Sequence, residues 1–327
     1  MIDLHAAMRD AIREGETARL HAPPNPWVGA LIVTDDGEIV GSGHTQVPGE
    51  AHAEVVALAK AGERARGATL VVTLEPCCHV GRTGPCTEAI IAAGIRRVVI
   101  GVPDPDPRVA GGGSTALRAA GIEVMSGIEI EAVRAQLAPY LWHRMTGRPY
   151  VVAKVASTVD GIVAMADGSS QWITGDDARR DAHLLRAQSQ AIIVGAGTVR
   201  SDNPRLTARL DDIVLEPLRV VLGAAPEGAL VHPCWERQGD ERKIMQELGA
   251  HDVLQVLIEG GPTTISRFLE RGLVNHVVWY QAPAFAGANG TIGALQSMTT
   301  GTLSGLQRAR FTGVRMIGDD IRIDMEL

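Results

Sequence analysis

The chain has 327 residues, which at roughly 150 residues per domain predicts two domains, each large enough to bury its own core. It is 45% hydrophobic and 21% charged, a composition that excludes disordered, collagenous and coiled-coil proteins. Aromatic residues make up only 3% and the formal net charge is −7, so a protein that binds nucleic acid by stacking and charge is not expected. Four cysteines and no long apolar stretch predict a soluble cytoplasmic protein that does not enter a membrane.

The first half of the chain alternates helical and strand-like segments. Apolar spacing predicts helices over 4–12, 51–61 and 85–93, a short helix ending at Gly121, and strands over 28–33, 69–74, 97–102 and 122–125. A polar helix over 129–145 runs into Gly147 and Pro149, which predict its end. We therefore place a domain boundary near residue 146, with domains 1–146 and 147–327.

The second half repeats this style. We expect strands over 150–155, 191–194, 219–222, 253–258, 274–280 and 321–325, and helices over 176–187 and 263–271. Between Gly223 and Val253 there is only a short polar stretch. Both halves are thus predicted to be α/β domains with helices packed on mostly parallel or mixed sheets.

A zinc site is predicted in the first half. His52-Ala53-Glu54 opens a predicted helix, and Cys77 and Cys86 frame the segment that leads into the next one. Three nitrogen or sulfur ligands with an open fourth position suit a catalytic zinc ion, and zinc deaminases combine His-x-Glu with Pro-Cys and a second Cys. His52, Cys77 and Cys86 are therefore the predicted ligands. Glu54 is the predicted proton shuttle.

Two other interpretations of these residues remain open. His52 is an ordinary helical histidine in one, and the zinc ion is structural in the other, with His79 as a fourth ligand, which would leave Glu54 without a role. Cys78 and Cys234 are interpreted as small packing residues.

Glycine turns are the main signal in the second half. Gly195-Ala196-Gly197 ends a predicted strand, and Gly260-Gly261 links a strand to a helix whose free N–H groups could receive a phosphate. Turns that merely close β–α connections are the alternative. This half has no Gly-x-Gly-x-x-Gly, so a Rossmann fold is not indicated.

The segment between the cysteines carries a family resemblance. His-Ala-Glu followed by Leu-Glu-Pro-Cys-x-His-x-Gly-Arg-Thr-x-Pro-Cys resembles the bifunctional deaminase/reductase of riboflavin biosynthesis, and the residues 24–29 and 102–107 agree with it. Asp106 stands where that family usually has Asn. In the second half, the segments 154–161, 169–175, 197–204 and 259–262 resemble the reductase domain of the same family.

The resemblance implies a cytidine-deaminase-like α/β/α domain followed by a dihydrofolate-reductase-like α/β domain that uses NADPH. It places the deaminase substrate at Asn25, His44, His79 and Arg82. It places the ribose phosphate substrate of the reductase at Lys154, Ser170, Ile173, Thr174, Arg186, Leu206, Arg209 and Glu259. It places the nicotinamide cofactor at Ala156, Trp172, Thr198, Asp202 and the segment from Gly261 to Arg267.

The expected function is two consecutive steps on a small pyrimidine ribose phosphate. The first half would deaminate 2,5-diamino-6-ribosylamino-4(3H)-pyrimidinone 5′-phosphate, with Glu54 moving the proton, and the second would reduce the ribosyl group with NADPH. Lys154 and Asp202 would orient groups or handle a proton there. A homo-oligomer, either a dimer or a tetramer, is expected.

Three alternatives stay open. The second domain is degraded and serves only substrate binding or assembly, which a trimmed 223–253 segment would favour. The first domain acts on nucleic acid, which the charge and the few aromatics oppose. The protein is a non-enzymatic, zinc-stabilised interaction protein.

Overall fold

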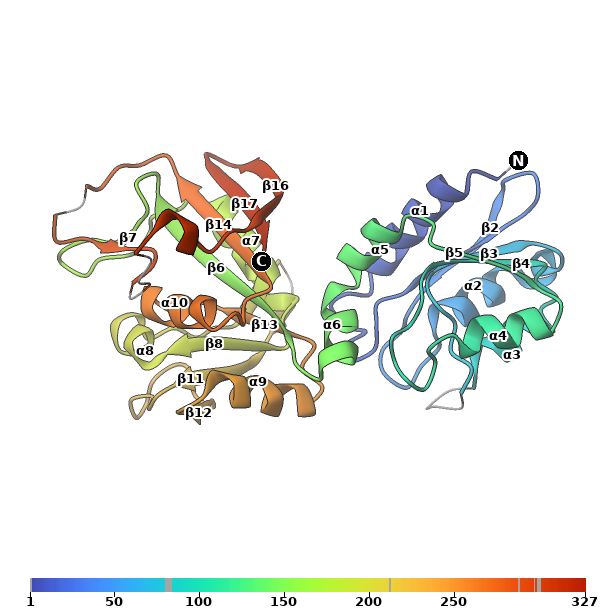
Figure 1. Cartoon of the computed structure of the whole chain (residues 1–327), viewed down its shortest axis with the longest axis horizontal. Coiled ribbons are helices and arrows are strands. Elements are labelled where there is room, and N and C mark those ends of the chain that lie inside the picture. Colours follow the sequence, from blue (N-terminus) through green and yellow to red (C-terminus); the bar gives the residue numbers. More distant parts are fainter. Residues whose placement is uncertain (1, 80–83, 212, 288, 297, 299–300) are drawn as a thin grey trace. The chain divides into compact units, whose positions relative to one another are not determined.

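The structure is a computed structural model that describes the chain except for residues 1, 80–83, 212, 288, 297 and 299–300. The chain divides into two compact units, Met1–Gly147 and Arg148–Leu327 (Figure 1). Among the described residues, no helix combines the length and the apolar character that crossing a membrane requires.

The first unit is built on a five-stranded mixed sheet of order β2-β1-β3-β4-β5. β1 pairs antiparallel with both β2 and β3, whereas β3, β4 and β5 are parallel. The strands are β1 (Gly29–Val33), β2 (Ile39–His44), β3 (Thr69–Leu74), β4 (Arg97–Val102) and β5 (Glu123–Ser126).

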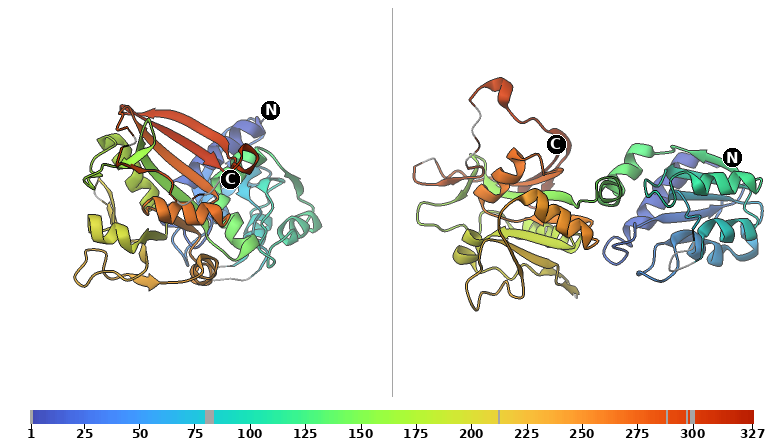
Figure 2. Two further views of the ribbon diagram at one scale, coloured as in Figure 1. Left: turned by 60° about the vertical axis from the view of Figure 1, so that its left-hand side comes forward. Right: turned by 60° about the horizontal axis from the view of Figure 1, so that its bottom comes forward.

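Helices cover both faces of this sheet, so the unit is the expected α/β/α sandwich (Figures 1 and 2). On one face lie α1 (Leu4–Glu16) and α5 (Ile130–Gln136), and on the other α2 (Ala53–Ala61), α3 (Cys86–Ala92) and α4 (Gly112–Ala119). The remaining helices are the 3-10 turn η1 (Gly62–Ala65) and α6 (Ala138–Thr146).

The second unit contains an eight-stranded sheet of order β12-β11-β8-β13-β6-β14-β17-β16. The strands from β12 to β14 are parallel, and β17 and β16 add an antiparallel hairpin at one edge. Their bounds are β6 (Tyr150–Thr158), β8 (Ala191–Gly195), β11 (Leu218–Leu222), β12 (Trp235–Arg237), β13 (Gln255–Ile258), β14 (His276–Ala282), β16 (Arg310–Ile317) and β17 (Asp320–Glu326).

Two small antiparallel pairs and several helices complete this unit. The pairs are β7 (Ile162–Ala164) with β15 (Ile292–Gly293), and β9 (Ala208–Leu210) with β10 (Ile213–Leu215). The helices are α7 (Asp176–Ala187), α8 (Ala196–Asp202), α9 (Glu241–Ala250), α10 (Pro262–Glu270) and the 3-10 turn η2 (Leu303–Gly305).

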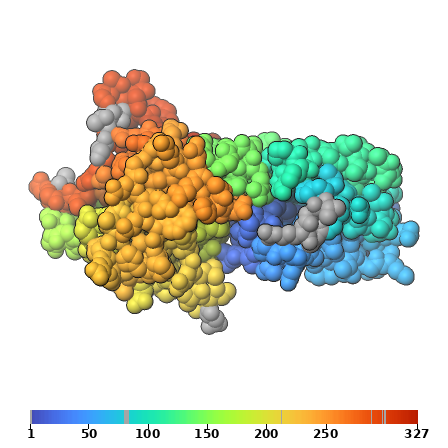
Figure 3. All heavy atoms as spheres, turned by 90° about the horizontal axis from the view of Figure 1, so that it is seen from below, coloured from blue at the N-terminus to red at the C-terminus, as the bar shows by residue number. Residues whose placement is uncertain are grey.

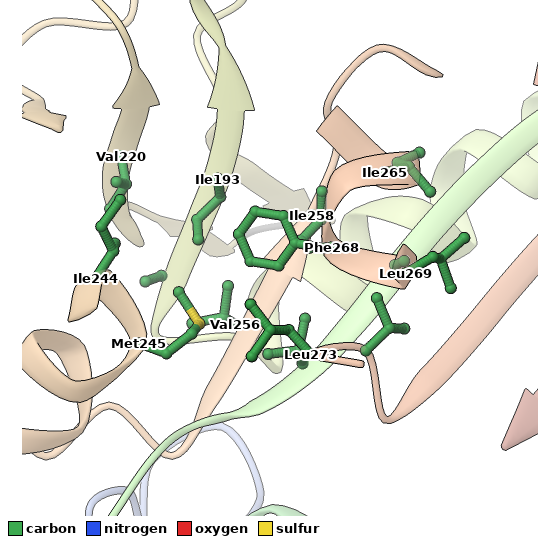
Figure 4. Packing of buried hydrophobic residues seen from close by; sticks show 14 of the residues in the cluster. Ile193, Val220, Ile244, Met245, Val256, Ile258, Ile265, Phe268, Leu269 and Leu273 are labelled. Carbon is green, nitrogen blue, oxygen red and sulfur yellow. The ribbon is translucent and has the colours of Figure 1, made fainter. Parts of the chain in front are cut away.

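Alternate residues of the central strands supply two separate cores. Ile193 of β8 packs on one side with Met245 of α9 and Phe268 of α10 (Figure 4), and the space-filling view shows this side as the gold and orange surface of the unit (Figure 3). Ile192, one residue earlier, lies in the opposite core with Val199 of α8. Successive side chains of a strand point to opposite faces, so both faces of this sheet must be apolar.

One predicted helix is wrong as a single element. The segment 129–145 forms two helices, because α5 ends at Gln136 and Leu137 leaves helical geometry with φ −95° and ψ 11°. Pro139 lies in the first turn of α6, where its missing N–H costs nothing, but it could not continue α5.

The segment between Gly223 and Val253 also differs from the expectation of a polar stretch alone. It contains the edge strand β12 and the helix α9, in which Ile244, Met245 and Leu248 are buried. Asp240 begins the helix by accepting a hydrogen bond from the Arg242 amide at 3.0 Å. This edge of the second sheet is therefore complete, with a strand and a covering helix. The short length of the 223–253 segment no longer gives a reason to expect a degraded reductase domain.

Candidate functional site

The start of α2 is held against β2 by glycine. A Cβ added at Gly43 would lie 2.4 Å from the carbonyl oxygen of Ala53, and one added at Gly41 would lie 2.2 Å from that of Ala57. Only glycine allows this approach of helix to strand. The contact positions His52, which precedes the helix, and Glu54 in its first turn.

The two cysteines are brought together by the start of α3. Cys77 follows β3 after Pro76, and Cys86 is the first residue of α3. The amide of Cys86 donates to Cys77 Sγ at 3.3 Å, and the amide of Thr87 donates to the Cys77 carbonyl oxygen at 3.2 Å. Backbone N–H groups at the helix start therefore favour a thiolate at Cys77.

The three predicted ligands converge. His52 Nδ1 lies 3.6 Å from Cys77 Sγ and 3.3 Å from Cys86 Sγ, and the three ligand atoms all lie within 4.8 Å of one another. Tetrahedral zinc, with bonds of about 2.0 Å to nitrogen and 2.3 Å to sulfur, would hold N and S about 3.5 Å apart. These residues fit a zinc ion.

Electrostatics at the trio favour a bound cation. The pKa of Cys77 is lowered to about 4, first because the Cys86 thiol donates to it and then through His52. The pKa of Cys86 is raised, because that thiol donates to Cys77 and because it is buried. A dication among these atoms would remove the cost of a second thiolate.

Glu54 is buried beside this trio, and burial raises the pKa of its carboxyl group. Because burial disfavours the charged carboxylate, Glu54 is suited to accept a proton and return it, which is the requirement for a shuttle.

Sequence reasoning missed the residues that hold the loop after β4. The buried Glu75 carboxylate accepts hydrogen bonds from the amides of Gly111 and Ser114, at 3.1 and 2.8 Å. Buried Asp104 accepts from the Tyr140 hydroxyl at 3.1 Å. Glu75 stands two residues before Cys77, so it ties this loop to the segment that carries the predicted metal ligands. Its position in the Leu-Glu-Pro-Cys motif was the available signal.

The predicted deaminase-substrate residues have different surroundings. His44 Nδ1 lies 2.9 Å from Glu14 Oε1, and Asn25 lies in the loop before Trp27. His79 Nδ1 is buried and has no hydrogen-bond partner in the described part of the chain. Arg82 lies outside the described residues. Asp106 is already paired, since Arg108 binds its two oxygens at 3.0 and 2.6 Å.

In the second unit, three predicted residues gather: Lys154 in the middle of β6, Glu259 directly after β13, and Arg186 near the end of α7. Arg186 binds the two carboxylate oxygens of Glu259 at 2.6 and 2.7 Å, and it donates to the Thr207 carbonyl oxygen at 3.1 Å. The Lys154 side chain is partly buried and lies close enough to this pair for both charges to act on its ammonium group. Burial lowers the pKa of Lys154, whereas the neighbouring Glu259 opposes that shift. The pKa of Glu259 is lowered, because Arg186 and Lys154 outweigh the effect of burial.

The two glycine turns meet. The hydroxyl of Thr198 accepts a hydrogen bond from the Gly261 amide at 3.0 Å, which joins the start of α8 to the start of α10. A Cβ added at Gly260 would lie 2.7 Å from Thr264 Cβ, and one added at Gly195 would lie 2.8 Å from Thr264 Oγ1. Backbone N–H groups in such a tight cradle fit the phosphates of a dinucleotide.

The other predicted reductase residues lie on several elements. Trp172 is 69% exposed with the Arg179 guanidinium over its ring at 4.7 Å, and Arg209 lies 3.1 Å from His183 Nε2. The remaining positions are Ala156 on β6, Ser170, Ile173 and buried Thr174 in the segment before α7, Asp202 at the exposed end of α8, and buried Leu206 with φ 55°. His183 was missed, although it lies one helical turn from Arg186.

The fold and the two clusters define a zinc-binding deaminase domain joined to a reductase domain. Comparison with known families agrees: residues 1–102 match the cytidine and deoxycytidylate deaminase zinc-binding region, and residues 149–323 match the RibD C-terminal domain. The chain belongs to the RibD family of bifunctional deaminase/reductases of riboflavin biosynthesis. The resemblance inferred from the sequence is thereby confirmed.

Similar proteins cover nearly the whole chain. The riboflavin biosynthesis protein RibD of Mycobacterium tuberculosis is 42% identical over 330 residues, covering 98% of this chain and 96% of the relative. The structure of Acinetobacter baumannii RibD matches with a TM-score of 0.92 at 36% identity, covering 99% and 98%. A deaminase/reductase from Thermotoga maritima matches with a TM-score of 0.89 at 33% identity, also covering 99% and 98%.

Family membership sets aside the non-enzymatic interpretation. The cofactors are the zinc ion of the deaminase domain and the NADPH of the reductase domain. The predicted fold class is confirmed as well, whereas the individual substrate and cofactor contacts stay predictions.

Proposed function

We propose that the first unit deaminates 2,5-diamino-6-ribosylamino-4(3H)-pyrimidinone 5′-phosphate and that the second reduces the ribosyl group of the product. The name of the Thermotoga maritima relative, a diaminohydroxyphosphoribosylaminopyrimidine deaminase and 5-amino-6-(5-phosphoribosylamino)uracil reductase, supports both steps. The observation that carries the proposal is the convergence of His52, Cys77 and Cys86 beside buried Glu54.

These three residues would hold a zinc ion, which would supply Lewis-acid activation of a water molecule for the deamination step. Glu54 takes a proton from the attacking water and delivers it to the departing ammonia. Its burial keeps the carboxylate out of bulk solvent, and its raised pKa suits both transfers. His79 Nδ1, buried and without a partner among the described residues, is a candidate to orient the substrate. Arg82, Asn25 and His44 complete the proposed substrate contacts.

In the reduction step, bound NADPH would supply a hydride to C1′ of the ribose, and the ring oxygen would gain a proton as the ring opens. Lys154 is the proposed donor or orienting group, because it is partly buried and its ammonium group interacts electrostatically with Glu259. The Thr198–Gly261 turn would hold the cofactor phosphates, with Ala156, Trp172 and Asp202 as further contacts. Substrate contacts are proposed at Ser170, Ile173, Thr174, Arg186, Leu206, Arg209 and Glu259.

The test follows ammonia and NADPH together. Zinc-loaded protein should release ammonia from the diaminopyrimidine phosphate even when NADPH is absent. When NADPH is added to the same reaction, it should be consumed as well. Glu54→Gln should lower ammonia release by roughly 10²- to 10⁴-fold and leave reduction of pre-deaminated substrate unchanged. Lys154→Met should lower the reduction of pre-deaminated substrate and leave ammonia release unchanged. Ammonia release without any NADPH consumption would overturn the reductase assignment, and unchanged ammonia release by Glu54→Gln would overturn the role of Glu54.

We also propose that the protein is a homo-oligomer in the cytoplasm. The edge strand β16 supports association, because its Phe311, Val314 and Met316 are 67%, 64% and 64% exposed. The free thiols of the proposed zinc site support a reducing compartment. Light scattering of the purified protein tests the oligomer, and a monomeric mass would overturn it.

A further inference from the structure

A second cluster of metal-ligating side chains lies at the edge of the second sheet, outside the proposed chemistry. His232, Cys234 and Glu236 each offer a ligand atom, and these atoms all lie within 4.8 Å of one another. Cys234 and Glu236 flank Trp235, the first residue of β12, and alternate residues of a strand point to the same side. His232 stands two residues before Cys234, in the connection that leads to β12. Trp235 packs against the core that contains Met245 and Phe268, whereas Cys234 packs against the core on the other face of the sheet.

Hydrogen bonds orient these ligand atoms. His232 Nε2 lies 3.2 Å from the carbonyl oxygen of Pro226, which can only accept, so Nε2 carries the proton and Nδ1 keeps its lone pair. That Nδ1 lies 3.5 Å from Cys234 Sγ, close to the roughly 3.5 Å that tetrahedral zinc would impose on nitrogen and sulfur. Glu236 Oε1 accepts from the Ala225 amide at 2.9 Å. A carbonyl behind an imidazole and an amide behind a carboxylate are typical outer partners of metal ligands.

We propose that His232, Cys234 and Glu236 bind a divalent transition-metal ion of the zinc type, with the fourth position open to solvent. A thiolate and an imidazole disfavour Ca²⁺ and Mg²⁺, which prefer oxygen ligands. Binding breaks the S–H bond of Cys234, forms a sulfur–metal bond and releases the proton to solvent.

The ion would brace the connection between β11 and β12. Pro226 and Ala225 belong to this connection, and farther along it the Leu230 amide donates to Asn203 Oδ1 at 2.8 Å. Asn203 directly follows α8, the helix that carries Thr198. The site is independent of the proposed function, because none of its ligands takes part in either reaction.

Metal stoichiometry of the full-length protein tests the site. After loading with Zn²⁺ and dialysis, the wild type should retain two zinc ions per chain, one at each cluster. Cys234→Ser and His232→Gln should each retain one, while both keep ammonia release at the wild-type rate. Cys86→Ser should also retain one ion but lose ammonia release, which separates the two sites. His251→Gln, at a histidine beside Trp235 outside the trio, is the matched control and should retain two.

Thiol protection gives a second readout that does not depend on the folding of a variant. Zn²⁺ should slow alkylation of Cys234 in the wild-type protein at least tenfold, and a chelator should restore it. His232→Gln should abolish this protection. A wild type that retains one ion, or a Cys234 that is alkylated at the same rate with and without Zn²⁺, would overturn the proposal.

Discussion

Arg186 on α7 and Glu259 after β13 form two parallel hydrogen bonds of 2.6 and 2.7 Å, although 73 residues separate them in the chain. The side chains are only 18% and 8% exposed, so the pair is held away from bulk water. Lys154 lies close enough for the charges of Glu259 and Arg186 to shift its pKa. One carboxylate therefore compensates two partly buried cations at the proposed reductase site.

Replacing Glu259 by Gln should disrupt both stability and reduction. It leaves Arg186 and Lys154 without a negative partner, and breaking a buried pair in this way costs about 3–5 kcal/mol. The free energy of unfolding of the second unit, measured with urea, should fall by that amount. NADPH consumption should be lost, while ammonia release persists. Glu247→Gln, which opens the more exposed pair of Glu247 with Arg237, is the control and should change neither. Full reductase activity in Glu259→Gln would contradict the role given to this pair.

The Thr198–Gly261 hydrogen bond predicts a selective effect on the cofactor. Thr198→Val keeps the shape but leaves the Gly261 amide without its acceptor, a loss of about 1–3 kcal/mol. The turn should then loosen, so KM for NADPH should rise roughly tenfold with little change in kcat or in ammonia release. Thr198→Ser retains the hydroxyl and should behave like the wild type. An equal loss in the Val and Ser variants would mean that packing of the methyl group, not the hydrogen bond, matters there.

The proposed zinc ligands could be named from the sequence because the chemistry of the residue types restricts them. A histidine at a helix start and two cysteines around a strand–helix connection have few other uses, and the ligand atoms do converge. The Arg186–Glu259–Lys154 cluster carries no comparable signal. It arises when β6 and β13 pair in parallel, and only the family resemblance pointed to its members.

The missed elements have physical reasons. β2 contains Gly41-Ser42-Gly43, which has no apolar alternation, because the glycines serve the approach of α2. β16 exposes most of its side chains and so lacks a buried face to detect. By contrast α9 was detectable, since Ile244, Met245 and Leu248 have helical spacing after the capping residue Asp240.

The approach of α2 to β2 predicts that Gly43→Ala damages deamination from a distance. The new Cβ would meet the Ala53 carbonyl oxygen at 2.4 Å, so the start of α2 must shift and carry His52 and Glu54 with it. Overpacking of this kind costs about 1–3 kcal/mol, and a shift near 1 Å can lower a rate about 100-fold. Ammonia release should fall by at least tenfold while NADPH consumption on pre-deaminated substrate is kept. Gly301→Ala, where a Cβ would meet no atom of the described residues within 4 Å, serves as the control. Wild-type ammonia release by Gly43→Ala would show that α2 absorbs the clash.

Buried Asp104 predicts a specific pH dependence of stability. Burial raises its pKa from 3.8 to about 6, so between these values the folded protein holds a proton that the unfolded chain has lost. Stability therefore falls as pH rises through this window, and above it the full cost of about 3 kcal/mol remains. Asp104→Asn removes the titrating group and still accepts from the Tyr140 hydroxyl.

The free energy of unfolding of Asp104→Asn relative to the wild type should thus increase by about 2–3 kcal/mol between pH 4 and pH 7. The ionisation of Asp106 does not contribute to this difference between the two proteins. Arg108 lowers its pKa to about 2, so its contribution is lost only as pH falls below 3.8, and it is common to both proteins. Amide hydrogen exchange in β3 and β4 reports the unfolding of the first unit at each pH. Parallel curves for the two proteins would mean that Asp104 ionises in the folded state without the cost that its burial implies.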